Sequence, residues 1–565
     1  MSIASEAPRA ARRRSAGLAL LLLLCVGPFL ARPIHLDEPV FVWVARQIAR
    51  DPLDFYGFEL NWTGTREPVH AFMMNPPLAS YYLALVASAL GWSDAAVHAA
   101  FVPVALAALL GAVALAARLS SRPLIAGLAT LFSPAFLASC TMAMSDTLAL
   151  ALWLWALVLW DRGLRDASRG RLAAAALLAG LAALSEYFAL ALIPLLALHA
   201  ALTARRAGAW LAALALPLGM IAAYEWAGAQ LYGHSPLLGA AGYVADYHGA
   251  TLAAHARKLA LGLVFAGGGA ASLLFLAPAL GPGRERLRWL LPLGLGCGKL
   301  VLALAIARGA GASTLAQLFV WCAAGVGVLA LALGDLLRTR RPESALLFAW
   351  VLGCFAFASF LNWTPNARSV LPLVPAVGIL VARRLDRRAA AGRPARPAGI
   401  AAGLALAAAL SVAVLDADAR LASASRAAAE ALVGGLRAGG ARVWFQGHWG
   451  FQYYAEALGA EPLDRARSQL EAGDWILRPA NNSYLFPLPA RSLGPPSQRE
   501  FPVHCCLSTM HPAAQAGFYA ATFGALPFAF GAAPPERYFV YRSRAHFDFG
   551  ARAGTGRGRP RAGPR

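Results

Sequence analysis

Long apolar runs separated by short polar connections dominate the first 415 residues of this chain. Many of the runs reach about 18 residues with almost no charge, the length that crosses the hydrocarbon core of a bilayer. The pattern predicts thirteen membrane-spanning helices, several of them short, at residues 15–31, 96–119, 122–139, 142–160, 171–185, 186–203, 209–231, 256–280, 287–307, 313–336, 343–361, 369–382 and 398–415.

Two segments do not fit the spanning pattern. Residues 32–95 are polar and aromatic, and their apolar stretch "PPLASYYLALVASALGW" would invert every later connection if it crossed the membrane. We expect it to form a helix lying on the membrane surface. Residues 416–565 contain three strand-like runs, "ARVWFQG", "GDWILRPA" and "RYFVYRSR". They predict a small α/β or α+β domain at 416–549, after a membrane domain at 1–415 and before a disordered basic tail at 550–565.

The charged residues support this division. The chain is 59% hydrophobic and 14% charged, with 50 Lys and Arg against 29 Asp and Glu. With the N-terminal Arg12–Arg14 in the cytoplasm, the Arg-rich "RLSSRP", "DRGLRDASRGR" and "LLRTRRPES" all fall inside, as the positive-inside rule requires. The first apolar run resembles a signal peptide, but this alternation needs it as an uncleaved span. The sequence therefore predicts a multi-pass protein of the bacterial inner membrane with a periplasmic C-terminal domain, and membrane lipids rather than nucleic acid as its surroundings.

Motifs for bound metals or nucleotides are not evident. The seven cysteines form no CxxC or zinc spacing, and no phosphate-binding glycine loop stands out. The glycines of "AGGGA", at 266–270, lie inside a predicted span and indicate close helix packing. We expect no required cofactor, although the sequence leaves a divalent metal open.

Three acids near the outer membrane edge are the candidate catalytic residues. Asp37 and Glu38 follow the first span directly in "ARPIHLDEPV", where partial burial would raise the pKa of a carboxylate toward that of a useful base. Asp146 lies about one turn inside the outer end of a span, and acids in such places are functional candidates. The alternatives are solvated juxtamembrane acids for the pair and a helix cap for Asp146. Because all three lie on one side, they can converge on a single exoplasmic site.

Candidate donor- and acceptor-binding residues lie on the same outer side. A guanidinium at the start of a span can grip a phosphate with two hydrogen bonds, although contact with phospholipid headgroups is the alternative. Asn75, an amide before a Pro-Pro pair, can cap a helix or face a site. Glu186, an acid at a turn, can also be an ordinary loop residue. The candidates are Asn75, Arg66, His70, Glu186, Lys258 and Arg368.

These features together resemble the membrane-embedded GT-C glycosyltransferases. The matching features are "HLDEPVF" after the first span, "NPPL" before a surface helix, the acid in "MSDTLALALWLWALVLW", about thirteen spans and an exoplasmic C-terminal domain. The branch that looks most similar is the family 39 type, which holds protein O-mannosyltransferases and lipid A aminoarabinose transferases. The resemblance covers residues 15–385, is strongest at 32–200, and includes the tail only by its position.

The resemblance implies a reaction and roles. One sugar would pass, with inversion, from a polyprenyl-phosphate-linked donor to a lipid, glycan or protein acceptor at the outer face. Asp37 would act as base or acceptor-orienting group, with Glu38 beside it and Asp146 as a second acid. Several relatives carry Lys where this chain has Glu186, so phosphate binding would fall on Arg368, Arg66 or Lys258.

Two other classes of function remain open at this stage. A multi-span transporter or flippase also places acids within spans, although no internal repeat relates the two halves of this chain. The other alternative is a non-catalytic scaffold in envelope assembly. If the chain is an enzyme, we expect its tail to influence acceptor choice through aromatic residues near His448 and Tyr454.

Overall fold

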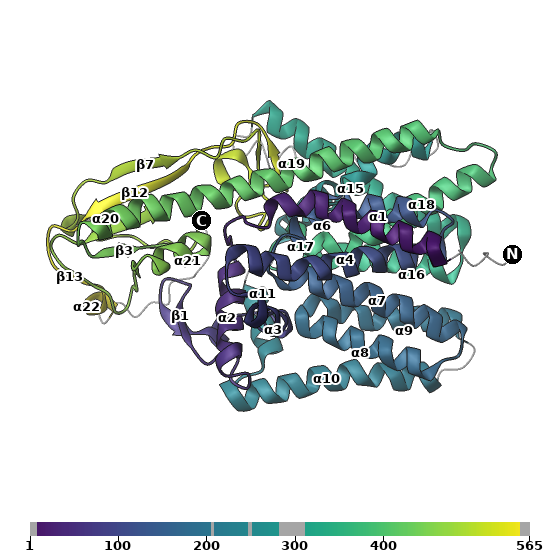
Figure 1. Ribbon diagram of the computed structural model, residues 1–565, viewed down its shortest axis with the longest axis horizontal. Helices are drawn as coiled ribbons and strands as arrows, with labels where there is room; N and C mark the ends of the chain where they lie inside the picture. Colours follow the sequence, from purple (N-terminus) through teal and green to yellow (C-terminus); the bar gives the residue numbers. More distant parts are fainter. Residues whose placement is uncertain (1–7, 205–207, 247–250, 282–310, 554–565) are drawn as a thin grey trace.

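The computed structural model describes residues 8–204, 208–246, 251–281 and 311–553. A helical bundle fills one end of the long axis and a strand-containing C-terminal domain the other, with the first loop between them (Figure 1). The helices of the bundle and loop are α1 (Pro8–Val26), α2 (Glu38–Arg50), α3 (Leu78–Leu90), α4 (Asp94–Leu119), α5 (Pro123–Leu131), α6 (Pro134–Ser139), α7 (Ser145–Arg165), α8 (Arg169–Ser185), α9 (Leu192–Thr203), α10 (Gly208–Tyr232), α11 (Pro236–Asp246), α12 (Leu252–Gly269), α13 (Ser272–Leu276), α15 (Ala312–Thr339), α16 (Pro342–Ala356), α17 (Ala367–Val370), α18 (Val374–Ala390) and α19 (Pro397–Ala429).

The bundle is that of a multi-pass membrane protein. Within the described ranges, six helices are long and apolar enough to cross a membrane, and the pair α12 and α13, bent by 65°, makes a seventh. Other expected spans are broken into shorter helices, as where Pro134 separates α5 from α6. The span expected at 287–307 lies outside the described residues. The count of thirteen therefore stays a prediction.

The first loop packs two helices and a hairpin between bundle and C-terminal domain (Figure 1). Helix α3 begins directly after Pro76–Pro77, as the sequence indicated, and the Ser80 hydroxyl donates to the Phe41 carbonyl oxygen of α2 at 3.2 Å. Strands β1 (Glu59–Asn61) and β2 (Arg66–Pro68) pair antiparallel. The position of α3 at the membrane surface stays a prediction.

The C-terminal domain is built on a mixed five-stranded sheet in the order β4-β3-β6-β12-β7. The three runs predicted to be strands contain its central strands β3 (Val443–Phe445), β6 (Trp475–Pro479) and, except for the first residue, β12 (Glu536–Arg542). The remaining elements are α20 (Gly435–Ala438), α21 (Trp449–Ala457), α22 (Phe549–Ala553), β4 (Glu461–Pro462), β5 (Gln469–Leu470), β7 (Ser497–Phe501), β8 (Leu507–Ser508), β9 (Met510–His511), β10 (Ala516–Gly517), β11 (Ala529–Phe530) and β13 (Phe547–Asp548).

Helix α19 joins the two parts without a break. It runs past the expected boundary at 415/416 to Ala429, and a π-helical turn at Glu430–Gly434 continues it into α20. The expected boundary therefore lies within a helix. Of the tail expected at 550–565, the first residues belong to α22, and 554–565 lie outside the described residues.

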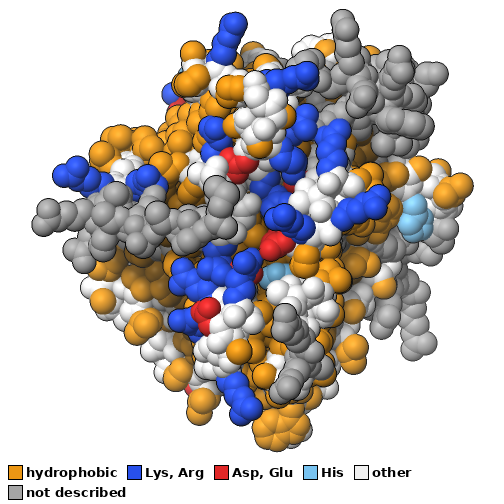
Figure 2. Space-filling model, turned by 90° about the vertical axis from the view of Figure 1, so that its right-hand side faces the viewer, with side chains coloured by type: hydrophobic (Ala, Val, Ile, Leu, Met, Phe, Trp, Pro, Cys, Tyr) orange, Lys and Arg blue, Asp and Glu red, His pale blue; other side chains and the backbone are white. Residues whose placement is uncertain are grey.

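The Arg-rich connections gather at the end of the bundle away from the C-terminal domain. Figure 2 shows Lys and Arg side chains concentrated in the middle of that face, among acids. Arg383 pairs with the fully buried Asp335 at 3.0 Å, and Arg165 reaches Glu343 at 3.2 Å. The positive-inside prediction requires all Arg-rich connections to lie on one side of the bundle, and they do so among the described residues. The orientation in a membrane stays a prediction.

Close packing between α12 and α15 depends on glycine. A Cβ atom on Gly267 would collide with the backbone carbonyl oxygen of Trp321, and one on Gly325 with that of Leu263. The two helices therefore approach backbone to backbone, as the "AGGGA" motif indicated.

We predict that Gly325→Leu destabilises the bundle, because the added side chain forces the two backbones apart. Overpacking typically costs about 1–3 kcal/mol, and a backbone collision belongs at the upper end of that range. Gly327→Leu on the same helix is the control, since a Cβ there meets no heavy atom within 4 Å. Thermal unfolding of both purified variants measures the difference, and equal melting temperatures would contradict the packing described.

Candidate active site

The adjacent carboxylates Asp37 and Glu38 enter two different clusters of side chains. Asp37 occupies the N-cap position of α2 without a side-chain capping bond and Glu38 is the first helical residue, so the helical turn directs the two side chains about 100° apart. The Asp37 side chain is 47% exposed, whereas that of Glu38 is fully buried. One acid is therefore accessible to a substrate and the other is not.

Arg368 holds the exposed cluster together. Its Nε donates to Oδ2 of Asp146 at 2.8 Å, and its Nη1 lies 3.5 Å from Oδ2 of Asp37. The Arg368 side chain is 16% exposed and that of Asp146 only 6%. Residues 222 positions apart in the sequence thus meet as a carboxylate–guanidinium–carboxylate group, which we call the Asp37–Arg368 cluster.

Polar side chains on the Asp146 side extend this cluster. The Ser145 hydroxyl donates to Oε2 of Glu186 at 2.5 Å, and the Asn75 amide donates to the same oxygen. Tyr56 in turn donates its hydroxyl to the Asn75 carbonyl oxygen at 2.5 Å. Asn75 and Glu186, both predicted from the sequence, are therefore bonded to each other. Ser145, the residue that precedes Asp146, connects them to the Asp37–Arg368 cluster.

The surroundings of Asp37 change its affinity for a proton. Desolvation by the surrounding protein atoms raises the pKa of Asp37 above its ordinary value of 3.8, even though water reaches about half of the side chain. The Arg368 guanidinium opposes this rise, and the carboxylates of Asp146 and Glu38 add to it. Asp37 thus combines exposure with a stronger basicity than an ordinary aspartate has.

Glu38, the second acid of the predicted pair, lies in a buried cluster. Its Oε1 accepts from Arg32 at 3.1 Å, His98 at 3.0 Å and the Ala143 amide at 2.8 Å, while Oε2 accepts from the His35 amide at 2.7 Å. Burial alone would raise the pKa of Glu38, but Arg32, His98 and these hydrogen bonds lower it to about 2. Both oxygens are occupied and inaccessible to solvent, which favours the helix-start charge, the alternative that the sequence left open for Glu38.

Arg32, which the sequence analysis missed, connects this buried cluster to the C-terminal domain. Its Nη1 donates to Oδ2 of Asp418 at 2.9 Å, and its Nε donates to the Thr141 carbonyl oxygen at 3.2 Å. Asp418 accepts further hydrogen bonds from the hydroxyls of Tyr519 at 2.8 Å and Thr509 at 2.9 Å. A buried charge needs a partner of opposite charge. The position of Arg32, directly after an apolar run, was therefore the feature of the sequence that could have indicated its role.

The other predicted cations lie in different surroundings. Arg66 is 61% exposed on β2 and pairs with Glu59 at 3.2 Å. His70 lies 3.0 Å from His234, ring nitrogen to ring nitrogen, and stacks on Tyr232.

Lys258 lies on a helix that packs against the one carrying Arg368. It donates to the Asn362 carbonyl oxygen at 3.0 Å from α12, the helix that packs against α17, which carries Arg368. In the described part of the chain, no three or more His, Cys, Asp or Glu side chains are arranged to hold a metal ion.

Comparison with known proteins identifies the fold. No family model and no curated protein matches the sequence. ArnT from Cupriavidus metallidurans bound to undecaprenyl phosphate is 12% identical, with a TM-score of 0.51 over 84% of this chain and 94% of that one. The oligosaccharyltransferase of Archaeoglobus fulgidus is 14% identical, with a TM-score of 0.48 over 80% of this chain and 62% of that one. At such identities the ArnT likeness establishes the fold alone, and it confirms the predicted GT-C fold.

We predict that Glu38→Gln destabilises the protein by about 3–5 kcal/mol, because the neutral amide loses the charge-assisted hydrogen bonds from Arg32 and His98 and turns its NH2 group toward buried donors. The folded pKa of about 2 is below the ordinary 4.5, so this stabilisation is complete above pH 4.5 and is lost as the pH falls toward 2. The difference in melting temperature between the wild type and Glu38→Gln should therefore become smaller as the pH is lowered.

Glu59→Gln provides the matched control, since the Glu59 carboxylate is 44% exposed and makes only surface ion pairs among the described residues. Its melting temperature should stay close to that of the wild type. A deficit of Glu38→Gln that is no larger than that of the control would contradict the buried role.

Proposed function

We propose that this chain transfers a single sugar from a polyprenyl-phosphate-linked donor to an acceptor at the outer face of the membrane, with inversion. The observation that carries the proposal is the Asp37–Arg368 cluster: an exposed carboxylate with a raised pKa, 3.5 Å from a guanidinium that a second acid holds in place. The fold shared with ArnT, a protein seen bound to undecaprenyl phosphate, supports the choice of a lipid-linked donor.

Asp37 is the proposed base. Its exposed side accepts a hydrogen bond from the hydroxyl or amine of the acceptor. As the acceptor atom attacks the anomeric carbon, its proton passes to Asp37, and the bond from that carbon to the phosphate oxygen breaks on the opposite face. The electron pair of this bond leaves with the lipid phosphate. A raised pKa makes the carboxylate a stronger general base.

Arg368 is the proposed partner of the leaving phosphate. A guanidinium has five N–H donors, and its contacts with Asp146 and Asp37 use only Nε and Nη1. The remaining donors can bind phosphate oxygens, where negative charge develops as the sugar leaves. Asp146 fixes the position of the guanidinium, and Lys258 on the adjoining helix adds a second positive charge.

Glu186 takes a supporting role in this proposal. Through its bonds with Ser145 and Asn75 it fixes the start of α7, the helix that carries Asp146. The residue that several relatives use as a phosphate-binding Lys would thus act here as an anchor for a neighbouring acid. No metal ion is assigned a role.

Replacing Asp37 with Asn tests the reaction. In proteoliposomes supplied with radiolabelled polyprenyl-phosphate sugars and bacterial envelope acceptors, Asp37→Asn should lower kcat by at least about 100-fold, because general base catalysis is lost. Asp51→Asn, an exposed acid at the other end of α2, should leave kcat unchanged. Unimpaired transfer by Asp37→Asn would show that the base is assigned wrongly. Movement of a lipid or solute across the bilayer without cleavage of a sugar–phosphate bond would show that the protein is a transporter.

The pH dependence of kcat/KM provides a separate prediction. Activity needs ionised Asp37, so it should fall as the pH decreases, with an apparent pKa above the ordinary 3.8 of an aspartate. Asp146→Asn removes a charge that raises the pKa of Asp37, so the acid limb of that variant should move to lower pH. An acid limb that stays in place in Asp146→Asn would show that the titrating group is not Asp37.

A further inference from the structure

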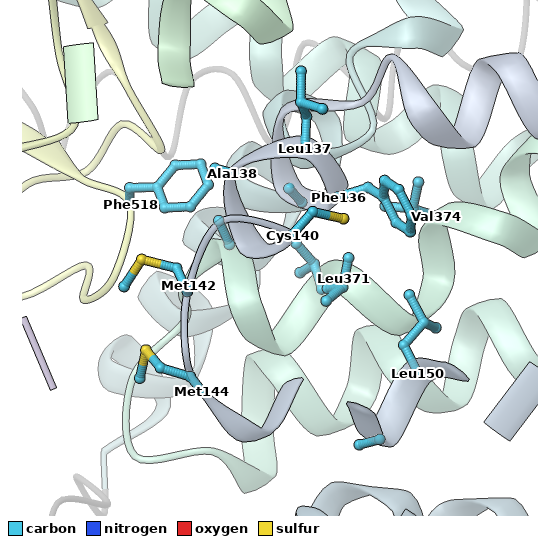
Figure 3. Packing of buried hydrophobic residues seen from close by; sticks show 14 of the residues in the cluster. Phe136, Leu137, Ala138, Cys140, Met142, Met144, Leu150, Leu371, Val374 and Phe518 are labelled. Atoms are coloured by element: carbon cyan, nitrogen blue, oxygen red, sulfur yellow. The ribbon is translucent and has the colours of Figure 1, made fainter. Parts of the chain in front are cut away.

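The segment Phe518–Ala521 of the C-terminal domain contacts the loop that carries Arg368. The Ala367 amide donates to the Phe518 carbonyl oxygen at 2.7 Å, and the Ala521 amide donates to the Pro365 carbonyl oxygen at 3.0 Å. These two hydrogen bonds hold the residues that directly precede Arg368. Figure 3 shows the Phe518 ring pointing from the C-terminal domain toward Ala138 of α6, and the ring is buried.

The same segment also reaches the stretch that carries Asp37. Tyr519 is buried and donates its hydroxyl to Oδ2 of Asp418 at 2.8 Å, and that oxygen also accepts from Arg32. Arg32 binds Glu38, the residue next to Asp37. A chain of charge-assisted hydrogen bonds, each stronger than a neutral one, therefore runs from Tyr519 to the start of α2.

A second residue of the domain holds this stretch independently. The Ile34 amide donates to the hydroxyl of Tyr454 on α21 at 2.7 Å, and Tyr454 donates to Oδ2 of Asp94 at 2.7 Å. Tyr454 is thus a structural anchor for the stretch before Asp37. The stretch before Asp37 is tied to the C-terminal domain at two points.

We infer that the C-terminal domain completes the catalytic site: Phe518–Ala521 sets the separation between Asp37 and Arg368, and Tyr519 is a positioning residue for both. The inference rests on the proposed function, which assigns Asp37 and Arg368 to acceptor and donor. One short segment holds both partners, and a misplacement of 1 Å in a reacting group can cost about 100-fold in rate. The domain is therefore part of the catalytic machinery, beyond any part in acceptor choice, and its removal would disable transfer itself.

Tyr519→Phe tests this inference, because it keeps the buried ring and removes only the hydroxyl. We expect kcat to fall about tenfold, the effect of losing a hydrogen bond to a charged group, with the KM for the donor within about twofold of wild type. The acid limb of kcat/KM should move to higher pH, since Arg368 lowers the pKa of Asp37 less when the pair is looser. Tyr541→Phe, in the same domain on β12, is the matched control and should change none of these values.

Hydrogen–deuterium exchange separates this inference from the proposed function. Tyr519→Phe should speed amide exchange in peptides covering 32–38 and 365–370 relative to Tyr541→Phe, and leave peptides covering 335–350 unchanged. If the wild type transfers no sugar, the proposed function fails and the exchange result alone decides whether Tyr519 holds both segments. If Tyr519→Phe leaves both the exchange and the acid limb unchanged, or lowers only the melting temperature, Tyr519 has no positioning role and the inference is overturned.

Discussion

The buried guanidinium of Arg32 is the constraint on which the arrangement of this protein depends. Removing a charged group from water costs several kcal/mol, and only well-placed partners offset that cost. Arg32 has two carboxylates, Glu38 and Asp418, both almost inaccessible to solvent, and a backbone carbonyl at Thr141. These partners come from the first loop, from α19 and from the connection before α7. Satisfying one charge therefore fixes three parts of the chain around the residues that we assign to catalysis.

The features that sequence reasoning recovered are those that local patterns encode. Apolar length marks α4, α7, α15 and α19, short runs of aromatic and β-branched residues mark the three central strands of the C-terminal sheet, and Pro76–Pro77 marks the start of α3. Breaks within apolar runs escaped the same reasoning. The interruption before Pro134 coincides with a proline and the bend after Gly269 follows three glycines, and a hydropathy average weighs neither as a helix break.

The sequence predicted those residues of the candidate site that share one property, a position on the outer side of the membrane. Asp37, Asp146 and Arg368 were each placed on the outer side by counting spans, and they meet in the fold. The contrast between Asp37 and Glu38 was not predictable. It depends on Arg32 and His98, and on an Asp418 that lies 386 residues from Arg32. Nothing within a local window distinguishes an acid with a distant buried partner from an acid that faces a substrate.

The order of these residues along the chain has a consequence for biosynthesis. Arg32 is made long before its distant partners, since Asp418 follows 386 residues later and Tyr519 a further 101. At about 5–20 residues per second, the guanidinium waits on the order of a minute for its second carboxylate. In the proposed topology, the hydroxyl that completes the buried group must also be exported across the membrane. In that topology a nascent chain thus holds an incompletely paired charge at the membrane edge until the C-terminal domain has been translocated, so export of this domain must precede assembly of the site.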